Sequence, residues 1–338
     1  MPFSNQDYPT NPAGIDTAAS LALARQRAYQ LLSRLYLAGV TADLLPYVRA
    51  LPPLAATLPP IFAADEAAAE YHRLFRYHIF PYEGIFLDTT GLLGGQVTEA
   101  VLHSYHAAGL PGETDATSPD HLGHELALLA FLCAAEADAW TDGLPTQAAR
   151  MQHQQQAFLA DHLLRWLAPC MVAVQQAQAP FFASLAGLTL SLAADHYAAL
   201  PAPPEGAEWA LPEAPDLLAD EKTSLRDLAS YLMTPAYSGL YVGRETVARL
   251  ARELHLPRGF GPGRQMLTNL LRAAGQYEGA TPLFAALQAL VDEWLAAYAA
   301  TAAELPSLAR FVAPWQARAA QTRQLLATMQ QLAGQLVD

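Results

Sequence analysis

The stretch Ser118-Pro119-Asp120-His121-Leu122-Gly123-His124-Glu125-Leu126-Ala127-Leu128-Leu129-Ala130-Phe131-Leu132 predicts a helix with a polar entrance and an apolar body. Ser118 suits the N-cap and Pro119 the first helical position, and Asp120 complements the positive end of the helix dipole. His121 and Glu125 are four residues apart and share one helix face, while the leucines bury the other side. So dense a polar entrance indicates either an elaborate helix cap or a binding site.

The rest of the chain is also helical in composition and pattern. Hydrophobic residues make up 52% of the 338 residues, which excludes a disordered protein, and the 25 prolines indicate many short connections. β-branched residues are scarce, and we find no alternating pattern typical of a strand. We therefore predict an all-α fold with a helical bundle in residues 1–200, a proline-rich linker in 201–215 and an additional helical C-terminal section in 216–338.

Helix-spaced apolar residues, capping residues and prolines define the expected elements. The expected helices are about 16–38, 41–51, 61–78, 96–108, 118–140, 146–178 with an interruption at Pro169, 181–200, 216–233, 244–255, 264–274, 282–299 and 315–335. Residues 80–86, 91–95, 234–243 and 257–263 are expected to be non-helical.

Charge and cysteine content limit the partners and the compartment. The formal net charge is -13, which repels nucleic acid and anionic lipid and attracts basic partners. Cys133 and Cys170 lie in apolar helical runs, so we expect buried free thiols. Residues 1–15 lack the features of a signal peptide, and no apolar run reaches the ~18–20 residues that a membrane span requires. We expect a cytoplasmic protein with no stable membrane insertion.

Known metal and catalytic patterns are absent from the sequence. His121-x-x-His124-Glu125 differs from the His-Glu-x-x-His spacing of zinc enzymes, and no Glu-x-x-His pair occurs for a di-metal bundle. A general acid–base pair of Glu83 and His121 is conceivable, but no activated nucleophile accompanies it. The Gly259–Gly263 segment has no preceding strand and no Gly-Lys-Ser/Thr, so it predicts a loop between helices. We expect no metal, no cofactor and no catalytic residue.

Two interpretations of the aromatic and acidic residues stay open at this point. In the first interpretation, aromatic side chains form the walls of an apolar groove: Tyr71, Phe75, Tyr82 and Phe86. Three carboxylates then form its rim: Glu83, Asp120 and Glu125. Such a groove suits a peptide that combines apolar residues with guanidinium groups, because carboxylates pair with arginine. The other interpretation is that Phe75 and Phe86 are ordinary core residues.

Five short motifs, in order along the chain, resemble the TorD/DmsD/NarJ family of cytoplasmic chaperones for molybdoenzymes. They are Glu70-Tyr71-x-x-Leu74-Phe75, Pro81-Tyr82-Glu83, Gly91-Leu92-Leu93-Gly94, Pro119-Asp120-His121-Leu122-x-x-Glu125-Leu126 and Phe158-Leu159-x-x-His162-Leu163-x-x-Trp166-x-x-Pro169. The resemblance covers roughly residues 18–200 and implies an all-helical fold and a role without turnover. Two departures are Gly84-Ile85-Phe86 after the second motif, where Ser-Val-Tyr is common, and the additional residues 201–338.

The resemblance also implies a partner and a site. Members of the family bind the twin-arginine leader, and sometimes the body, of a molybdopterin-containing oxidoreductase until its cofactor is inserted. The implied peptide-binding residues are Asp120 and His121, with Pro81, Tyr82, Glu83 and Glu125 lining or supporting the region. The groove interpretation adds Tyr71 and Phe75 as apolar contacts of the peptide.

Three function classes follow from these observations. The favoured one is a leader-binding chaperone, and the others are a weak guanine-nucleotide-binding maturation factor and a non-catalytic all-α interaction protein. Long helices with proline-rich joints permit either a monomer or a domain-swapped dimer. For the chaperone, Asp120→Asn and Glu83→Gln are expected to weaken leader binding without unfolding the protein.

Overall fold

The computed structural model describes residues 12–90, 94–110, 117–201, 209–219, 222–257, 259–277 and 279–335, with side chains from residue 16 onward. The chain is 76% helical, and the described residues contain no strand, which confirms the predicted all-α fold. Residues 91–93 of the third motif lie outside the described residues.

Residues up to 200 form a first section of long and short helices. Its helices are α1 (Pro12–Ala38), α2 (Leu45–Arg49), α3 (Pro52–Ala55), α4 (Ala64–His72), α5 (Glu83–Leu87), α6 (Gln96–Ala107), α7 (Leu122–Thr141), α8 (Pro145–Phe158), α9 (Leu164–Gln176) and α10 (Pro180–Ala199). Two π-helical turns, η1 (Arg73–His78) and η2 (Leu159–Leu163), continue α4 and join α8 to α9. Proline occupies the first turn of α2, α3, α8 and α10, where its missing N–H costs nothing.

The remaining residues form a second helical section. Its helices are α11 (Leu225–Leu232), α12 (Pro235–Ser238), α13 (Arg244–Glu253), α14 (Gly263–Gln276), α15 (Ala280–Glu304), the 3-10 turn η3 (Pro306–Leu308) and α16 (Ala309–Gln335). The helix predicted from residue 216 begins only at Leu225, where Ser224 and Asp227 form a capping box. Residues 259–262 join α13 to α14, so the glycine-rich segment is a loop between helices, as predicted.

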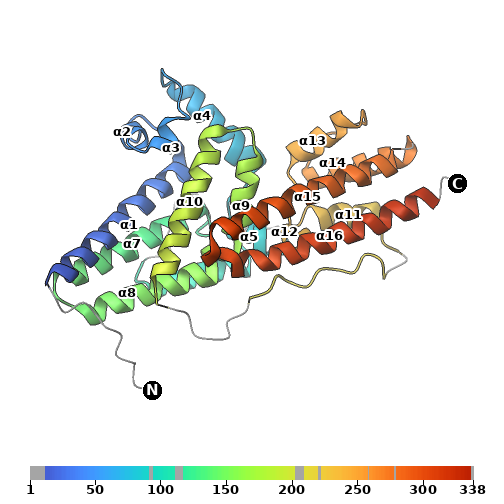
Figure 1. Ribbon diagram of the computed structural model, residues 1–338. Coiled ribbons are helices and arrows are strands. Elements are labelled where there is room, and N and C mark those ends of the chain that lie inside the picture. The colour runs from blue at the N-terminus through green and yellow to red at the C-terminus, as the bar shows by residue number, and fades with distance from the viewer. Residues whose placement is uncertain are drawn as a thin grey trace.

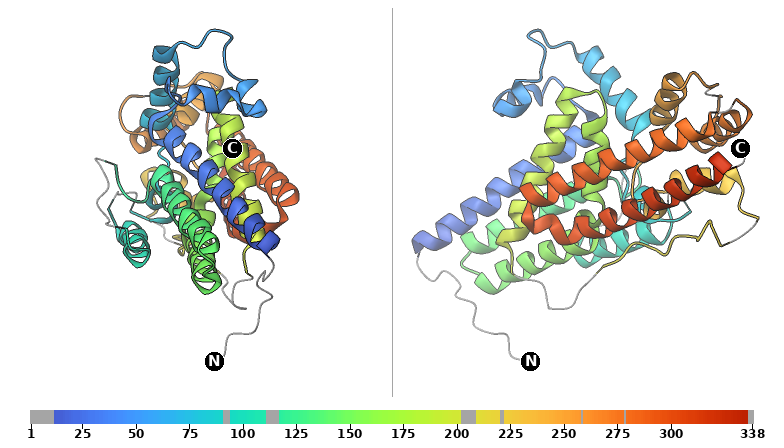
Figure 2. Two further views of the ribbon diagram at one scale, coloured as in Figure 1. Left: turned by 90° about the vertical axis from the view of Figure 1, so that its left-hand side faces the viewer. Right: turned by 45° about the vertical axis from the view of Figure 1, so that its right-hand side comes forward.

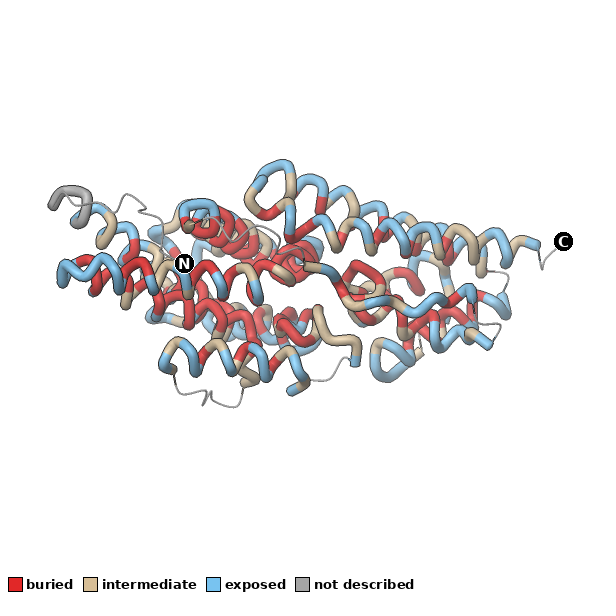
Figure 3. The backbone as a smooth tube through the Cα atoms, turned by 90° about the horizontal axis from the view of Figure 1, so that it is seen from below, coloured by how far each residue is buried: buried red, intermediate tan, exposed pale blue. Residues whose placement is uncertain are grey.

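The helices pack mainly side by side (Figures 1 and 2). α1 lies along α7, and α7 also packs on α8, while α9 packs on α10 and contacts both helices of the α15–α16 hairpin. That hairpin extends away from the first section toward the C-terminus. Figure 3 shows buried residues along the inner faces of the helices and exposed residues along the outer faces. This alternation is typical of amphipathic helices around a shared core.

One apolar core joins the two sections. It includes Phe86 of α5, whose ring stacks on Tyr241 with centroids 5.5 Å apart, and Tyr197 of α10, whose ring meets Phe311 of α16 edge-on at 5.3 Å. The predicted division at residues 201–215 stays a prediction, and the parts on either side of it share this core. Both cysteines are free and buried within the core, as predicted.

Pro169 lies at a contact between the two sections, because it leaves one backbone carbonyl of α9 without a donor in the helix. It lies inside α9, which continues through it, so the predicted interruption at this residue is wrong. A proline cannot donate to the carbonyl four residues earlier, and that carbonyl belongs to Arg165. Trp315 of α16 fills the gap, because its Nε1 donates to the Arg165 oxygen at 2.7 Å. The defect in one helix is therefore the attachment point of another.

Two helical stretches have the length and hydropathy of a membrane span. They are Pro145–Gln176, which includes α8 and α9, and Ala280–Glu304, which is α15. Their most apolar windows are 78% and 39% buried inside the protein. Length and composition are weak evidence here, because a core helix of a soluble protein passes the same test.

The contact between Trp315 and Arg165 predicts a coupling with Pro169. Trp315→Phe removes the indole N–H and leaves a buried carbonyl without a donor, so the free energy of unfolding should fall by about 1–3 kcal/mol. Pro169→Ala restores a backbone N–H for the same carbonyl, so Trp315→Phe should cost less in that background. Urea unfolding of the four proteins of this double-mutant cycle measures the coupling. Equal costs in both backgrounds would contradict this account.

Candidate functional site

The two central motifs of the sequence meet edge to edge. Tyr82 and His121 form an isolated antiparallel bridge. The amide of Leu122 donates to the Pro81 carbonyl at 2.8 Å, and the amide of Glu83 donates to the Asp120 carbonyl at 2.9 Å. The tertiary structure therefore joins Pro81-Tyr82-Glu83 to Asp120-His121-Leu122 directly.

Asp120 holds this junction together from inside the protein. Its side chain is fully buried, and its Oδ2 accepts a hydrogen bond from the Gly84 amide at 3.0 Å. Ser118 Oγ donates to the other carboxylate oxygen. Gly84 lies in the first turn of α5, so Asp120 compensates the N-terminus of α5. The prediction that Asp120 serves the dipole of its own following helix is wrong.

His121 caps the helix that the sequence assigned to Ser118. α7 begins at Leu122, and the Nδ1 of His121 accepts a hydrogen bond from the Gly123 amide at 3.0 Å. Burial lowers the pKa of His121 to about 3, so the ring is neutral and can accept at this nitrogen. The ring of Tyr82 packs edge-on against it, with centroids 4.8 Å apart. The predicted N-cap at Ser118 and first helical position at Pro119 are wrong because the chain turns first to form the bridge.

Glu83, Glu125 and His162 form a buried polar cluster beneath the bridge. The Nδ1 of His162 lies 3.2 and 3.3 Å from the two carboxylate oxygens of Glu83, and its Nε2 lies 2.9 Å from Ser104 Oγ. Trp166 Nε1 donates to one oxygen of Glu125 at 3.3 Å, while the other oxygen has no hydrogen-bond partner among the described residues. The cluster ties α5, α6, α7, η2 and α9 to one another.

The two carboxyl groups of this cluster ionise differently. Burial raises the pKa of Glu125 well above its ordinary value of 4.5, and the charge of Glu83 raises it further. Burial also raises the pKa of Glu83, but the hydrogen bond from His162 opposes that rise. Glu125 thus keeps its proton more readily, and the negative charge falls on Glu83 beside His162.

Tyr71 and Phe75 are also interior residues. The hydroxyl of Tyr71 donates to the backbone oxygens of Leu37 at 2.6 Å and Tyr36 at 3.1 Å. The Phe75 ring meets Phe182 of α10 edge-on, with centroids 5.1 Å apart. Both residues are at most 4% exposed, which agrees with the core interpretation of Phe75.

The predicted groove with Glu83, Asp120 and Glu125 on its rim is not what the structure shows. These three carboxyl groups are at most 3% exposed, and Phe86 is fully buried. A backbone amide, a serine hydroxyl, an indole and an imidazole hydrogen-bond to their oxygens, except for the one Glu125 oxygen that has no partner among the described residues. Tyr82 is half-buried and is the open member of the implied peptide-binding set, in which Pro81 is buried as well.

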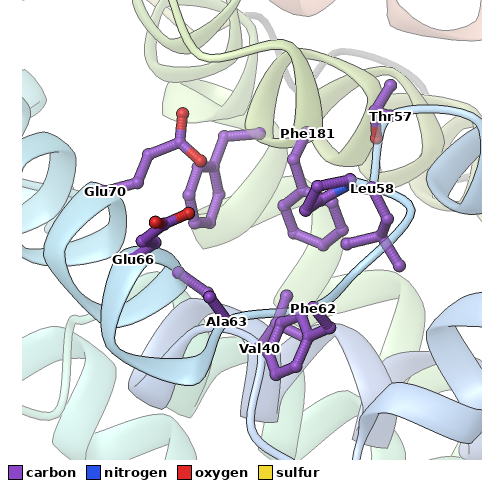
Figure 4. A pocket seen from close by; sticks show the side chains of 11 residues that line it. Val40, Thr57, Leu58, Phe62, Ala63, Glu66, Glu70 and Phe181 are labelled. Carbon is purple, nitrogen blue, oxygen red and sulfur yellow. The ribbon is translucent and has the colours of Figure 1, made fainter.

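An open pocket with the expected chemistry lies next to Tyr71 and Phe75. It has a volume of about 260 Å³ and lies between residues 57–63, α4 and the start of α10. Phe62, Phe181 and Phe182 supply its aromatic walls, and Phe182 contacts both Tyr71 and Phe75 behind it. We call it the α4 pocket; Figure 4 shows the residues that line it.

Two carboxylates mark one side of the α4 pocket. Glu66 and Glu70 are one turn apart on α4, and Figure 4 shows both on the side opposite Thr57 and Leu58. Within the part of the chain that the structure describes, neither carboxylate has an ion-pair or hydrogen-bond partner. Like charges at this spacing repel each other mildly, so a cation at the mouth of the pocket would be favoured there.

The sequence gives no signal that the residues lining this pocket lie together. Glu70 belongs to the first motif, whereas Phe62, Phe181 and Phe182 come from segments 120 residues apart with no shared pattern. His162 was present in the fifth motif, and its spacing from Trp166 was the available signal for a polar partner of Glu83. Among the described residues, no group of three or more His, Cys, Asp or Glu side chains has the geometry to hold a metal ion.

The raised pKa of Glu125 predicts a pH-dependent stability. The pKa of Glu125 is higher in the folded state than its ordinary value of 4.5. The protonated side chain therefore contributes to the free energy of unfolding in full below pH 4.5, and this contribution is lost as the pH rises toward the folded-state pKa. Glu125→Gln keeps an acceptor for Trp166 and cannot ionise. Its stability relative to the wild type should increase with pH, by up to about 1.4 kcal/mol per pH unit in that interval.

Denaturant unfolding from pH 5 to pH 9 measures this difference, because this pH range lies above the ordinary glutamate pKa of 4.5. Glu99→Gln at an exposed position on α6 is the matched control and should reproduce the wild-type profile. Parallel profiles for Glu125→Gln and the wild type would exclude a raised pKa at Glu125.

Comparison with known proteins gives one informative match. Residues 43–172 match the family model described as nitrate reductase delta subunit, and a search of curated proteins gives no match. The matched range runs from just before α2 into α9 and contains the bridge, the buried cluster and the lining of the α4 pocket except Val40, Phe181 and Phe182. This agrees with the resemblance found in the sequence motifs. The section of the chain that holds the Tyr82–His121 bridge matches the NarJ/TorD-like chaperone family.

Proposed function

We propose that this chain binds the twin-arginine leader of the precursor of a molybdenum-cofactor oxidoreductase and holds that subunit until its cofactor is inserted. The family is one of chaperones for molybdoenzyme maturation, which is the general role of this section of the chain. The observation that carries the more specific proposal is the α4 pocket, where an apolar cavity lies beside two carboxylates that have no partner among the residues described. Asp120, His121, Glu83 and Glu125 lie buried in the junction that follows η1, the continuation of α4.

The chemistry of the pocket matches that of such a leader. A leader of this class combines two adjacent arginines with apolar residues, so it needs carboxylates and an apolar cavity within a few residues of each other. Glu66 and Glu70 offer two acceptors for guanidinium groups, and Phe62 and Phe181 offer the apolar surface. A cavity of about 260 Å³ accommodates one or two side chains and leaves the rest of the leader on the surface.

The charge of the whole protein supports the same ligand. At a net charge of -13 the chain attracts a cationic leader over distances of about a Debye length, and repels polynucleotides. Binding is therefore expected to be faster and tighter at low ionic strength.

The carboxylates are tested by a double-mutant cycle across the interface. Glu66→Gln with Glu70→Gln should weaken binding of an Arg-Arg leader peptide by about fivefold, as expected for two partly exposed ion pairs. The same change should have no effect on a leader with Gln-Gln in place of Arg-Arg. Isothermal titration calorimetry at low and high salt measures both, and Asp65→Asn, on α4 but outside the pocket, is the control. Unchanged affinity for the Arg-Arg leader in the double variant would place the leader elsewhere, and absence of leader binding by the wild type would overturn the function.

The apolar wall is tested by a pair of neighbouring residues. Phe62 is half-buried and lines the α4 pocket, while Ile61 beside it is 85% exposed and does not. Phe62→Ala should weaken leader binding by about tenfold, because it removes the apolar surface that a leader side chain would cover. Ile61→Ala should bind as the wild type does. Fluorescence anisotropy of a labelled leader measures both, and equal losses in the two variants would contradict a specific pocket.

A further inference from the structure

A second pocket lies at the seam between the two sections. It has a volume of about 220 Å³ and is enclosed by η1, the end of α9, α13 and α15. Figure 1 shows α9, α13 and α15 around this part of the protein. We call it the seam pocket; its polar lining includes Arg73, His78, Glu245, Arg249, Arg252 and Trp294.

The seam pocket is positively charged in a strongly negative protein. Three arginines and one glutamate line it, a balance of +2, whereas the whole chain carries -13. Arg252 lies 3.2 Å from Glu245 and Arg249 lies 3.4 Å from Glu253, both in exposed pairs that are weakly bound in water. Within the described ranges of the chain, Arg73 donates to the Gln178 carbonyl alone, at 3.4 Å. All three guanidinium groups therefore retain donors for a further ligand.

A buried donor without an acceptor lies in the same wall. Trp294 is 1% exposed, and its Nε1 has no hydrogen-bond partner among the described residues. The Nδ1 of His78, which also lines the pocket, is likewise buried and without a partner in the described part of the chain. Buried polar groups are nearly always hydrogen-bonded, so two such atoms around one cavity indicate a missing ligand.

We propose that the seam pocket binds the phosphate group of a small molecule. A phosphate at neutral pH carries close to two negative charges and several acceptor oxygens, which matches the charge balance of the pocket and its unpaired indole donor. Planar guanidinium groups are suited to phosphate oxygens. The volume is that of about seven water molecules, which excludes a polymer and leaves room for a small body beside the phosphate. Leu74 and Leu290 supply the apolar surface for that body.

Binding at the seam would connect the sections. Arg73 and His78 belong to η1 in the first section, and Arg249 and Trp294 belong to α13 and α15 in the second. A ligand that contacts both stabilises the arrangement in which they meet and raises the melting temperature with increasing concentration.

The experiment measures thermal stability of the full chain during titration with inorganic phosphate and with phenyl phosphate, which separates a free ion from a phosphate on an apolar body. Sodium chloride at equal ionic strength corrects for screening. Phosphate also stabilises proteins in general through exclusion from their surface, so each variant is titrated in the same solutions and compared with the wild type.

Two variants and two matched controls decide the outcome. Arg249→Gln and Trp294→Phe should raise the half-saturating concentration by about tenfold or more, because each removes a donor to the anion. Arg165→Gln alters an exposed i,i+4 pair of the same kind with Asp161, and Trp209→Phe removes another indole N–H that lacks a partner among the described residues. Both controls should respond as the wild type does.

A nuclear magnetic resonance measurement keeps the test decisive if a variant folds poorly. The five indole N–H signals of the wild type are followed during phosphate titration, and that of Trp294 should move while that of Trp209 stays in place. An unmoved Trp294 signal, or melting curves in which the wild type and both pocket variants respond equally, would overturn the proposal. Because no leader peptide is involved, these results do not depend on the proposed function.

Discussion

The buried contact between Glu83 and His162 is the interaction on which the first section depends. A carboxyl group taken out of water is stable only when donors surround it, and here a single imidazole from η2 faces both of its oxygens. The other end of that imidazole reaches Ser104 on α6, so one side chain aligns three elements. The π-helical turn at Leu159–Leu163 places His162 at this point, as such turns often do where a side chain has a special role.

The Tyr82–His121 bridge follows from the same requirement. Glu83 can enter the interior only if the backbone before it is also provided with hydrogen-bond partners, and the segment around Asp120 supplies them. Asp120 then caps α5 and His121 caps α7, so two helices begin at one junction. Residues that the sequence presents as ligand contacts are therefore buried structural residues, whereas the two glutamates that line the α4 pocket lie on an open cavity.

The second section is part of the same structure through specific contacts. Pro169 leaves the Arg165 carbonyl without a donor inside its own helix, and the indole N–H of Trp315 donates a hydrogen bond to it. On the other side of α9, Tyr241 stacks on Phe86 and donates its hydroxyl to the His78 carbonyl at 2.8 Å. These contacts bring the arginines of α13 to the end of α4, and an acidic chain thereby acquires a basic pocket. The two pockets lie at the two ends of the segment formed by α4 and η1, with opposite charge.

The helical class, the approximate extent of most helices and the family resemblance of the first section can be predicted from the sequence. Those features depend on local periodicity, proline and glycine positions and short motifs, which the order of residues contains directly. The positions where prediction failed share a different cause. Ser118 has the side chain of a good N-cap, but α7 begins only at Leu122. The reason is the bridge between His121 and Tyr82, which lies 39 residues earlier in the chain.

Which acidic residues are buried and which are accessible to solvent becomes visible only in the folded structure. Glu83 and Glu70 are equally polar in the sequence, yet Glu83 has His162 within hydrogen-bonding distance, whereas Glu70 lines an apolar cavity and has no hydrogen-bond partner within the described part of the chain. Whether a charge is buried depends on the partners that other segments bring to it, and helical periodicity contains no information about those partners. For this reason a pocket with aromatic walls and acidic residues could be predicted from composition and motifs. Its position could not be predicted, because α4 and the start of α10 form it together only in the folded protein.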